Sequence, residues 1–297
     1  MSKDEKDGRG PAVADRTHTM RDGRRIPAIG LGTYPMDDAG AEADVAEALM
    51  LGYRMVDTAV NYGNETGVGR AIAAAGVPRD ELFLTTKLLG RDHGTDSVRR
   101  SLEGSLRRLG TDHVDLYLIH WPNPSVGRYV ETWRTMLELR QEGLVRSVGV
   151  SNFTPAHIRR LVEETGETPA VNQVELHPQY QQERLREFHA EHRIITQAWS
   201  PLGRKTDLLQ HEWIARIARR TGRTPAQVVL RWHLQSHTVP IPKSSDPRRM
   251  AENIDVFDFE LTDDELGRIA TLETGVSVAF DHRDPEKVTW LNNRRAR

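Results

Sequence analysis

The sequence from Tyr53 to Glu65 reads Tyr-Arg-Met-Val-Asp-Thr-Ala-Val-Asn-Tyr-Gly-Asn-Glu. Its first half has the apolar pattern of a short buried strand, which ends at the polar residue Asp57. Tyr62 follows one short turn later, and a helical pattern of small residues covers Gly67 to Ala75. The segment therefore predicts a strand, a polar connection and a helix.

This order of strand and helix repeats along the chain. Strands are expected at residues 28–34, 53–57, 81–87, 114–120, 146–150, 170–174, 194–199 and 238–242. Helices are expected at residues 41–51, 67–75, 96–109, 130–142, 155–164, 181–192, 211–220, 225–234, 248–253 and 263–270. Strands that alternate with helices are typical of a parallel sheet. Eight such units favour an α/β fold of the closed (β/α)8 TIM barrel type. No strand leads into Gly-x-Gly-x-x-Gly, which disfavours an open dinucleotide-binding sheet.

The ends of the chain show weaker patterns. Asp22-Gly23 is a hairpin-turn signal, so we expect a short N-terminal hairpin before the barrel. Residues 1–16 are expected to form a disordered leader, and residues 17–297 a single barrel domain. From Val276 onward the sequence predicts an irregular C-terminal tail.

Composition excludes several classes of function. The net charge of -2 and the pI of about 6.6 give no reason to expect nucleic acid or an anionic membrane as a partner. The chain has no cysteine, which excludes disulfides and thiolate metal sites. It also lacks a metal-ligand spacing such as His-Glu-x-x-His, so no metal is expected. No apolar run has the length of a membrane span, and the cytoplasm is the expected location.

Polar residues end most of the expected strands. In a (β/α)8 barrel the active site lies at the carboxyl ends of the strands. Asp57, Lys87 and His120 end three of them, and Tyr62 follows the first. The other candidates at strand ends are Thr33, Ser151, Asn152, Gln173, Trp199, Ser200, Lys243 and Ser244.

Asp57, Tyr62, Lys87 and His120 are residue types that together suit a proton-donating group. A tyrosine has a pKa of about 10, and a nearby ammonium such as Lys87 lowers the pKa by favouring the phenolate. Asp57 would keep Lys87 cationic, and His120 can donate a hydrogen bond to a carbonyl oxygen. A proton donor beside a carbonyl group suits the reduction of C=O, with Tyr62 supplying the proton.

Carbonyl reduction also requires a hydride donor, which implies a nicotinamide cofactor. Trp199 can stack on its ring. The residues that can hold its carboxamide are Ser151, Asn152 and Gln173. Lys243, Ser244 and Arg249 lie around the expected start of a helix, where cations and a hydroxyl suit a phosphate monoester. This cluster favours NADPH over NADH.

Several segments resemble the aldo-keto reductase family, in the family's order from about Met20 to the C-terminus. They are Gly30-Leu31-Gly32-Thr33, Asp57-Thr58-Ala59, Tyr62-Gly63-Asn64-Glu65, Thr85-Thr86-Lys87, Leu118-Ile119-His120-Trp121-Pro122, Gly149-Val150-Ser151-Asn152-Phe153, Asn172-Gln173-Val174-Glu175, Trp199-Ser200-Pro201-Leu202-Gly203 and Ile241-Pro242-Lys243-Ser244. The resemblance implies a (β/α)8 reductase that usually depends on NADPH.

The resemblance also implies roles for individual residues. The catalytic tetrad falls on Asp57, Tyr62, Lys87 and His120. Cofactor contacts fall on Thr33, Ser151, Asn152, Gln173, Trp199, Ser200, Leu202, Lys243, Ser244, Arg249, Glu252 and Asn253. The substrate pocket falls on Tyr34 and Trp121. Tyr34 stands where tryptophan is frequent, and Trp199 stands where many members have tyrosine. The second feature and the segment Phe280 to Pro285 are similar to bacterial members that act on diketo sugar acids.

Two other functions fit parts of the pattern. Lys87 at a strand end also suits a Schiff-base aldolase. A regulatory subunit that binds the cofactor without turnover is the alternative outside enzymes.

Arg249 and Glu252 also suit a solvated, salt-bridged helix face. Arg283, Arg294, Arg295 and Arg297 are a hint of an anionic substrate such as a keto sugar acid. The expected partner is a small carbonyl compound, and a monomer is expected.

Overall fold

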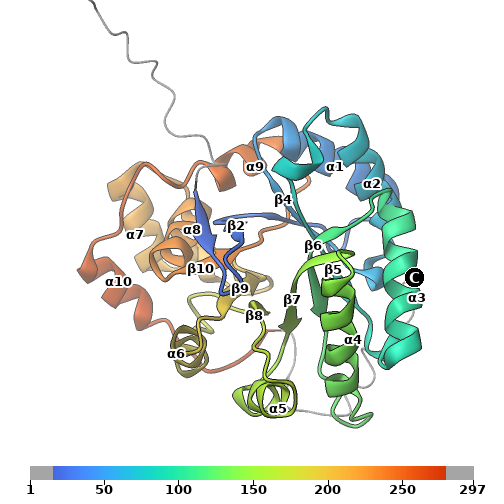
Figure 1. Cartoon of the computed structure of the whole chain (residues 1–297). Coiled ribbons are helices and arrows are strands. Elements are labelled where there is room, and N and C mark those ends of the chain that lie inside the picture. Colours follow the sequence, from blue (N-terminus) through green and yellow to red (C-terminus); the bar gives the residue numbers. More distant parts are fainter. Residues whose placement is uncertain (1–15, 279–297) are drawn as a thin grey trace, which may run out of the picture.

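Eight parallel strands form one sheet in the computed structural model, which describes residues 16–278 (Figure 1). The strands are β3 (Leu31–Gly32), β4 (Met55–Asp57), β5 (Phe83–Leu88), β6 (Val114–Ile119), β7 (Val145–Ser151), β8 (Val171–Glu175), β9 (Ile195–Trp199) and β10 (Thr238–Pro240). Their order in the sheet is their order in the chain, and every pair is parallel. This is the topology that the repeated strand-helix pattern predicts.

Backbone hydrogen bonds close this sheet into a barrel. The amide of Gly30 donates to the carbonyl of Pro240 over 3.1 Å, and the amide of Gly32 donates to Pro242 over 3.1 Å. A side chain at position 32 would put its Cβ 2.9 Å from the backbone oxygen of Ile241. Glycine is therefore needed where the first strand meets the last one. The expected (β/α)8 barrel is confirmed.

Ten α-helices surround the barrel in the described part of the chain (Figure 1). They are α1 (Asp38–Met50), α2 (Glu65–Ala74), α3 (Thr95–Leu109), α4 (Tyr129–Gln141), α5 (Pro155–Thr165), α6 (Glu183–Glu191), α7 (Glu212–Thr221), α8 (Pro225–Gln235), α9 (Pro247–Ile254) and α10 (Asp263–Ala270). The short 3-10 helices are η2 (Val60–Tyr62), η3 (Arg79–Glu81), η4 (Gly90–Asp92) and η5 (Leu208–Gln210). Each expected helix is found within three residues of its expected start. The first expected strand is shorter than expected, because only Leu31–Gly32 pairs with β4.

The strands alternate between two apolar clusters. Met55, Phe83, Leu116 and Leu118 belong to the cluster inside the barrel. The intervening residues of the same strands pack against the helices, and they include Val56, Leu84, Tyr117 and Ile119. Because side chains on a strand alternate with period two, the same inward direction continues to Asp57 and Lys87. The alternation therefore puts these polar residues on the interior, beyond the last apolar layer.

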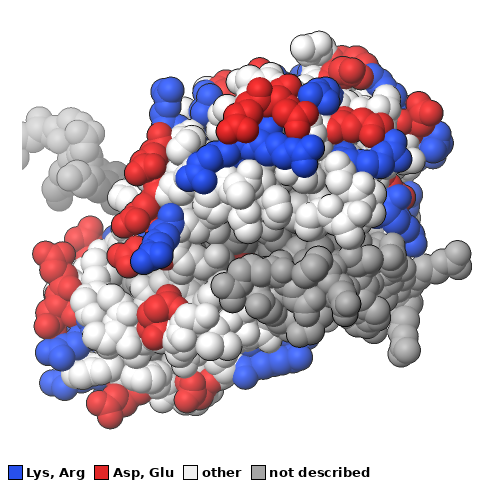
Figure 2. Space-filling view, turned by 90° about the horizontal axis from the view of Figure 1, so that it is seen from below, with Lys and Arg blue, Asp and Glu red and all other residues white. Residues whose placement is uncertain are grey.

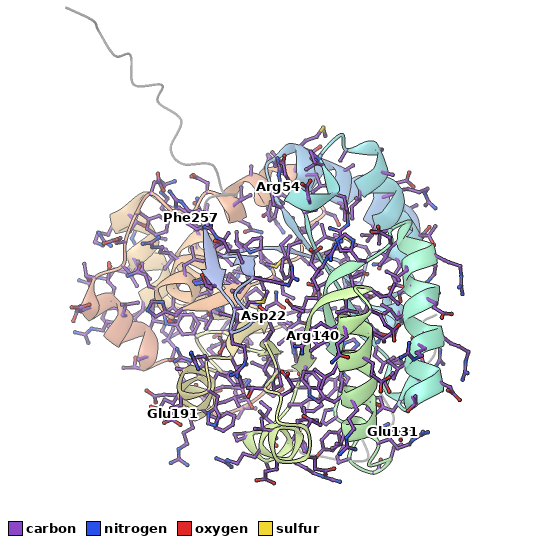
Figure 3. All side chains as sticks on the ribbon, viewed as in Figure 1. Asp22, Arg54, Glu131, Arg140, Glu191 and Phe257 are labelled. Carbon is purple, nitrogen blue, oxygen red and sulfur yellow. The ribbon has the colours of Figure 1, made fainter. Side chains whose placement is uncertain are left out.

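The expected N-terminal hairpin packs against the interior cluster. It consists of β1 (Thr17–Thr19) and β2 (Arg25–Pro27), which pair antiparallel. Ile26 is fully buried within the interior cluster. Asp22, in the turn, accepts a 2.6 Å hydrogen bond from the hydroxyl of Ser147 on β7. In Figure 3, Asp22 lies near the middle of the ring of helices, whereas Glu131 and Glu191 lie toward its edge. The hairpin thus joins the barrel through an apolar side chain and one hydrogen bond.

Several expectations concern residues outside the described range. The leader, apart from Arg16, lies outside it, as do Phe280 to Pro285 and the arginines 283, 294, 295 and 297. The division into a leader and one domain stays a prediction. Within residues 16–278, no helix combines the length and apolarity that crossing a membrane requires. On the face shown in Figure 2, positive and negative side chains are interspersed around an area of mostly uncharged residues.

Candidate active site

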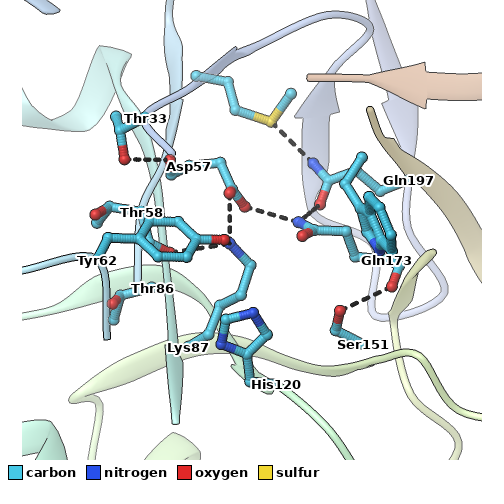
Figure 4. Close-up of polar contacts among 12 residues, drawn as sticks. Thr33, Asp57, Thr58, Tyr62, Thr86, Lys87, His120, Ser151, Gln173 and Gln197 are labelled. Atoms are coloured by element: carbon cyan, nitrogen blue, oxygen red, sulfur yellow. Dashed lines mark hydrogen bonds and ion pairs between the residues drawn. The ribbon is translucent and has the colours of Figure 1, made fainter. Parts of the chain in front are cut away.

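The structure brings Asp57, Lys87, Tyr62 and His120 together at one end of the barrel (Figure 4). Asp57 ends β4, and Lys87 lies near the end of β5. His120 follows β6, and Tyr62 ends the 3-10 helix η2. Lys87 and Asp57 are almost completely buried, with exposures of 0% and 2%. Three adjacent parallel strands and one short helix therefore converge on one point.

The ammonium group of Lys87 has three hydrogen-bond acceptors. It forms a short ion pair with Asp57 Oδ1. It also donates to the carbonyl oxygen of Thr58 over 3.1 Å and to Tyr62 Oη over 3.3 Å. An ammonium has three N–H groups, so every donor of Lys87 has a partner. The position of the charge beside the phenol is fixed.

Lys87 is held in its charged form. Burial lowers the pKa of Lys87, but Asp57 and Tyr62 raise it further, so that it lies above its usual value. Burial raises the pKa of Asp57, and Lys87 and Gln173 offset part of that increase. A Schiff base begins with a neutral amine, which these contacts disfavour. The geometry thus argues against the aldolase alternative.

The pKa of Tyr62 differs from the expectation. Burial raises the pKa of Tyr62 above its usual value, and Lys87 lowers it only in part. The sequence indicated the lowering effect of Lys87 correctly, but it contained no measure of burial. A raised pKa keeps the phenol protonated at neutral pH, which a proton donor requires.

His120 is neutral and lines the same pocket. Burial, followed by the nearby Lys87 ammonium, lowers the pKa of His120 well below its usual value. Its ring lies 5.8 Å from the ring of Tyr62 in an edge-to-face arrangement. Its Nδ1 atom is buried and has no partner among the described residues, whereas Nε2 is not enclosed in this way. Nε2 is therefore the nitrogen that can contact a ligand.

A pocket of about 490 Å³ opens beside these residues. Its walls include the predicted residues Thr33, Tyr34, Asp57, Tyr62, His120, Trp121, Asn152, Gln173, Trp199, Ser200, Leu202 and Lys243. The predicted residues that do not line it are Lys87, Ser151, Ser244, Arg249, Glu252 and Asn253. Lys87 lies beneath Tyr62, where it contacts the phenol oxygen directly.

The three predicted carboxamide contacts and Trp199 form one hydrogen-bonded group. Ser151 Oγ donates to the carbonyl of Gln173 over 2.8 Å. Asn152 Nδ2 donates to Ser151 Oγ and to the carbonyl of His120, and Asn152 Oδ1 accepts from Trp199 Nε1. Asn152 has a positive φ of 63°, a conformation that asparagine adopts more readily than most residues. The group is ordered by its own contacts.

The predicted phosphate contacts Lys243 and Ser244 form hydrogen bonds with neighbouring residues just before α9. Lys243 donates to Ser245 over 2.6 Å, and Ser244 bonds the backbone of Asp246. Asp246 caps α9 through a 2.9 Å bond from the amide of Arg248, so a carboxylate already occupies this helix start. The sequence-based prediction of a phosphate site did not consider the carboxylate of Asp246.

The remaining residues of the predicted phosphate and adenine contacts lie on α9 and differ in burial. Arg249 is exposed, and neither Arg249 nor Glu252 takes part in an ion pair among the described residues. The salt-bridged alternative for this helix face is thus not observed for these two side chains. Asn253 is buried and lies one helical turn after the exposed Arg249, on the same face of α9. The roles of Arg249, Glu252 and Asn253 as cofactor contacts stay predictions.

Three contributors were missed by sequence reasoning. The carbonyl of Thr58 accepts from Lys87, and no sequence pattern marks a backbone acceptor. Gln197 binds Gln173 over 2.8 Å, and its position between Ile195 and Trp199 on an alternating strand was a usable signal. Arg204 lines the pocket from a loop without periodicity. Within the described residues, no group of three or more potential ligand side chains could hold a metal ion.

Comparisons with known proteins show the family of this chain. The sequence profile described as "Aldo/keto reductase family" matches residues 28–274, which is most of the chain. This chain belongs to the aldo/keto reductase family. The 2,5-diketo-D-gluconic acid reductase B of Corynebacterium sp. (strain SHS752001) is 55% identical over 260 residues, covering 87% of this chain and 94% of the relative.

Two further members of the aldo/keto reductase family illustrate its range. The methylglyoxal reductase DkgA of Escherichia coli (strain K12) is 48% identical over 263 residues, covering 88% of this chain and 95% of that protein. A variant of Gox0644, solved in complex with NADPH, superimposes with a TM-score of 0.84 at 47% identity. That match covers 91% of this chain and 97% of Gox0644.

Proposed function

We propose that this aldo/keto reductase uses NADPH to reduce a small aldehyde or ketone to an alcohol, with Tyr62 as the proton donor. The observation that carries the proposal is the environment of the buried Lys87. Each of its three N–H groups has an acceptor, and one of these acceptors is Tyr62 Oη. A fixed positive charge beside the phenol stabilises the phenolate that forms when the proton leaves.

The direction of the Tyr62 proton follows from these contacts. Because Lys87 donates to Tyr62 Oη, the phenolic hydrogen must point away from Lys87. Tyr62 also lines the pocket, so its O–H can reach a carbonyl oxygen bound there. Neutral His120 can donate from Nε2 to the same oxygen, which orients the carbonyl group. Asp57 keeps Lys87 charged throughout.

The pocket residues fit the nicotinamide end of the cofactor. Gln173 lines the pocket, and both hydrogens of its amide nitrogen are used, so its Oε1 is the atom available to a carboxamide N–H. Asn152 and Trp199 lie at the same wall, where the indole offers a flat surface. When bound, the reduced nicotinamide supplies the hydride. Ser151 would act by holding Asn152 in place.

The preference for NADPH rests on the cations near α9. Lys243 lines the pocket, and Arg249 is exposed in the first turn of α9. Both are suitable ligands for a 2′-phosphate, with Ser244 and Ser245 as neighbouring hydroxyls. The NADPH complex of the Gox0644 variant supports this proposal, since that protein is 47% identical to this chain. Thr33, Ser200, Leu202 and Glu252 are proposed to contact other parts of the cofactor.

The substrate is proposed to be a small dicarbonyl or keto acid. Two similar proteins are named for 2,5-diketo-D-gluconic acid and methylglyoxal, which are compounds of this type. Tyr34 and Trp121 form apolar walls of the pocket, and Arg204 adds a cation at its mouth. The pocket is large enough for a compact substrate of a few carbon atoms beside the nicotinamide.

The experiment is a steady-state assay of NADPH oxidation with methylglyoxal and with 2,5-diketo-D-gluconate, together with NADPH binding measured by tryptophan fluorescence. We expect turnover of at least one substrate and weaker turnover with NADH. Tight binding of NADPH without reduction of any carbonyl compound would contradict the proposal and favour a regulatory role. Absence of binding by either cofactor would contradict the whole assignment.

A further inference from the structure

A buried glutamine that no sequence motif singled out lies directly behind the cofactor wall. Gln197 is on β9, completely buried, and is the strand partner of Gln173 on β8. Its Oε1 accepts a 2.8 Å hydrogen bond from Gln173 Nε2, and its own Nε2 lies 3.5 Å from the sulfur of Met55. Gln197 does not line the pocket. Any effect of Gln197 on a bound ligand is therefore transmitted through Gln173.

The contacts of Gln173 fix the orientation of its amide. Its Nε2 atom lies between two acceptors, Asp57 Oδ2 at 2.7 Å and Gln197 Oε1 at 2.8 Å (Figure 4). A flipped amide would point an oxygen at the Asp57 carboxylate, which is repulsive. A flipped Gln197 would point one N–H at another. The arrangement with both Gln173 hydrogens donated is the one that satisfies all of these groups.

The same bonds cross the interior of the barrel. Asp57 is on β4, whereas Gln173 is on β8, which is not a neighbour of β4 in the sheet. The Asp57 carboxylate is shared, because Oδ1 accepts from Lys87 and Oδ2 accepts from Gln173. Lys87 in turn contacts Tyr62 Oη at 3.3 Å. A continuous series of polar contacts thus leads from Gln197 to the phenol.

We propose that Gln197 is a positioning residue that holds Gln173 with Oε1 toward the cofactor's carboxamide and Nε2 toward Asp57, and so couples cofactor binding to the Lys87–Tyr62 pair. The proposal rests on the proposed function of Gln173 as a carboxamide contact. Among the described residues, no donor reaches Gln173 Oε1, which leaves this atom for a ligand.

The coupling has a physical basis in hydrogen-bond cooperativity. An amide that accepts at its oxygen becomes a stronger donor at its nitrogen. A carboxamide N–H bound to Gln173 Oε1 therefore strengthens the bond from Gln173 to Asp57. Asp57 then attracts the Lys87 ammonium less strongly, and Lys87 donates more strongly to Tyr62. Cofactor binding would in this way prepare the phenol to release its proton.

The first test compares two ligands on the variant Gln197→Met, which removes the acceptor and keeps an unbranched side chain. NADPH carries the carboxamide, whereas adenosine 2′,5′-bisphosphate carries only the phosphate end. We expect the Kd of NADPH to rise about fivefold, the size expected for one lost hydrogen bond, and kcat to fall about tenfold. The Kd of the bisphosphate should not change. An equal change for both ligands, or no change for NADPH, would overturn the proposal.

The second test uses Gln197→Glu, which retains an acceptor oxygen in every protonation state. Through Gln173 this position faces Asp57, and beyond it Lys87 and Tyr62. When protonated, the new side chain replaces glutamine closely, so NADPH affinity at pH 5 should match the wild type. When ionised, it places a second negative charge near Asp57, and kcat should fall as the pH rises. If kcat of the variant changed with pH in the same way as kcat of the wild type, the proposal would be overturned. This test remains decisive even if Gln197→Met fails to fold.

The matched control is Gln227→Met. Gln227 is also buried, but it caps α8 through Thr224, bonds the carbonyl of Asp255 and does not line the pocket. We expect this variant to lower thermal stability without changing the NADPH affinity relative to the bisphosphate. Wild-type turnover is measured in parallel. Its absence would contradict the proposed function, whereas the binding comparison would still decide the role of Gln197.

Discussion

The proposed catalytic centre and the predicted phosphate site differ in the environment of their cations. Lys87 is completely buried, and each of its three donors has a fixed acceptor. Lys243 and Arg249 are exposed, and Arg249 has no ion-pair partner among the described residues. Charges interact strongly in a buried environment and weakly in water, where salt screens them further. In the proposed function, proton transfer therefore uses groups that are already fixed in position, whereas selection of NADPH uses exposed cations.

The largest effect is expected from Tyr62→Phe, which tests the buried side of this comparison. The variant removes the proton donor but retains the ring that packs 5.1 Å from Tyr34 and 5.8 Å from His120. We expect kcat to fall by about three orders of magnitude, within the range typical of lost general acid catalysis. NADPH affinity should stay within about twofold of the wild type. A parallel loss of binding and turnover would contradict the assigned role.

The next effect concerns the buried ion pair itself. Asp57→Asn leaves Lys87 charged without its counterion, and breaking a buried pair in this way typically costs about 3 kcal/mol or more of unfolding free energy. The measurement is urea-induced unfolding. The control is Glu138→Gln, which removes an exposed partner of Arg99 and should leave the midpoint nearly unchanged. Similar losses in the two variants would show that burial does not separate these pairs.

A smaller effect is expected from a buried histidine that is held neutral. Burial lowers the pKa of His189 to about 3. Its two nitrogens contact Thr196 Oγ1 and Asn172 Nδ2 at 2.9 Å, and the second contact requires an unprotonated nitrogen. Below the unfolded pKa of about 6.5 the unfolded chain binds a proton that the folded chain rejects. Stability therefore falls as the pH decreases from 7 to 5, by about 2 kcal/mol from this residue.

Urea unfolding of wild type and His189→Gln at pH 7 and pH 5 checks this effect. The loss of stability between the two pH values should be smaller in the variant, because the titrating ring is gone. If the loss of stability were the same in the variant and the wild type, it would come from other buried histidines. His93 is one of these, because burial lowers its pKa to about 4.

The smallest effect is expected at the exposed side of the comparison. Arg249→Ala should weaken NADPH binding about tenfold and leave NADH binding unchanged, because only NADPH carries the 2′-phosphate. The difference should shrink as the salt concentration rises. Fluorescence titration measures both affinities. Arg248→Ala is the control on the same helix, since Arg248 already pairs with Asp246. A loss for both cofactors would argue against a phosphate contact.

The accuracy of the sequence-based predictions depends on the range of the interaction. The expected helix of residues 155–164 is α5, because Thr154 caps it, Pro155 begins it and Gly166 ends it with a φ of 73°. The expected strand of residues 28–34 was too long. Its extent depends on pairing with β4, which the sequence of residues 28–34 alone does not specify. Asn253 was assigned from the family resemblance, and no local pattern predicted that packing of α9 buries this side chain.

The sequence by itself determined the alternation of eight strands and their helices, and the placement of Asp57, Lys87 and His120 at strand ends. These follow from periodicity and local signals, which act over a few residues. Only the tertiary structure decided that Gln173 reaches Asp57 across the barrel, that Lys87 finds three acceptors, and that burial raises the pKa of Tyr62. The physical reason is that these contacts join residues up to 116 positions apart, and desolvation depends on the whole closed barrel.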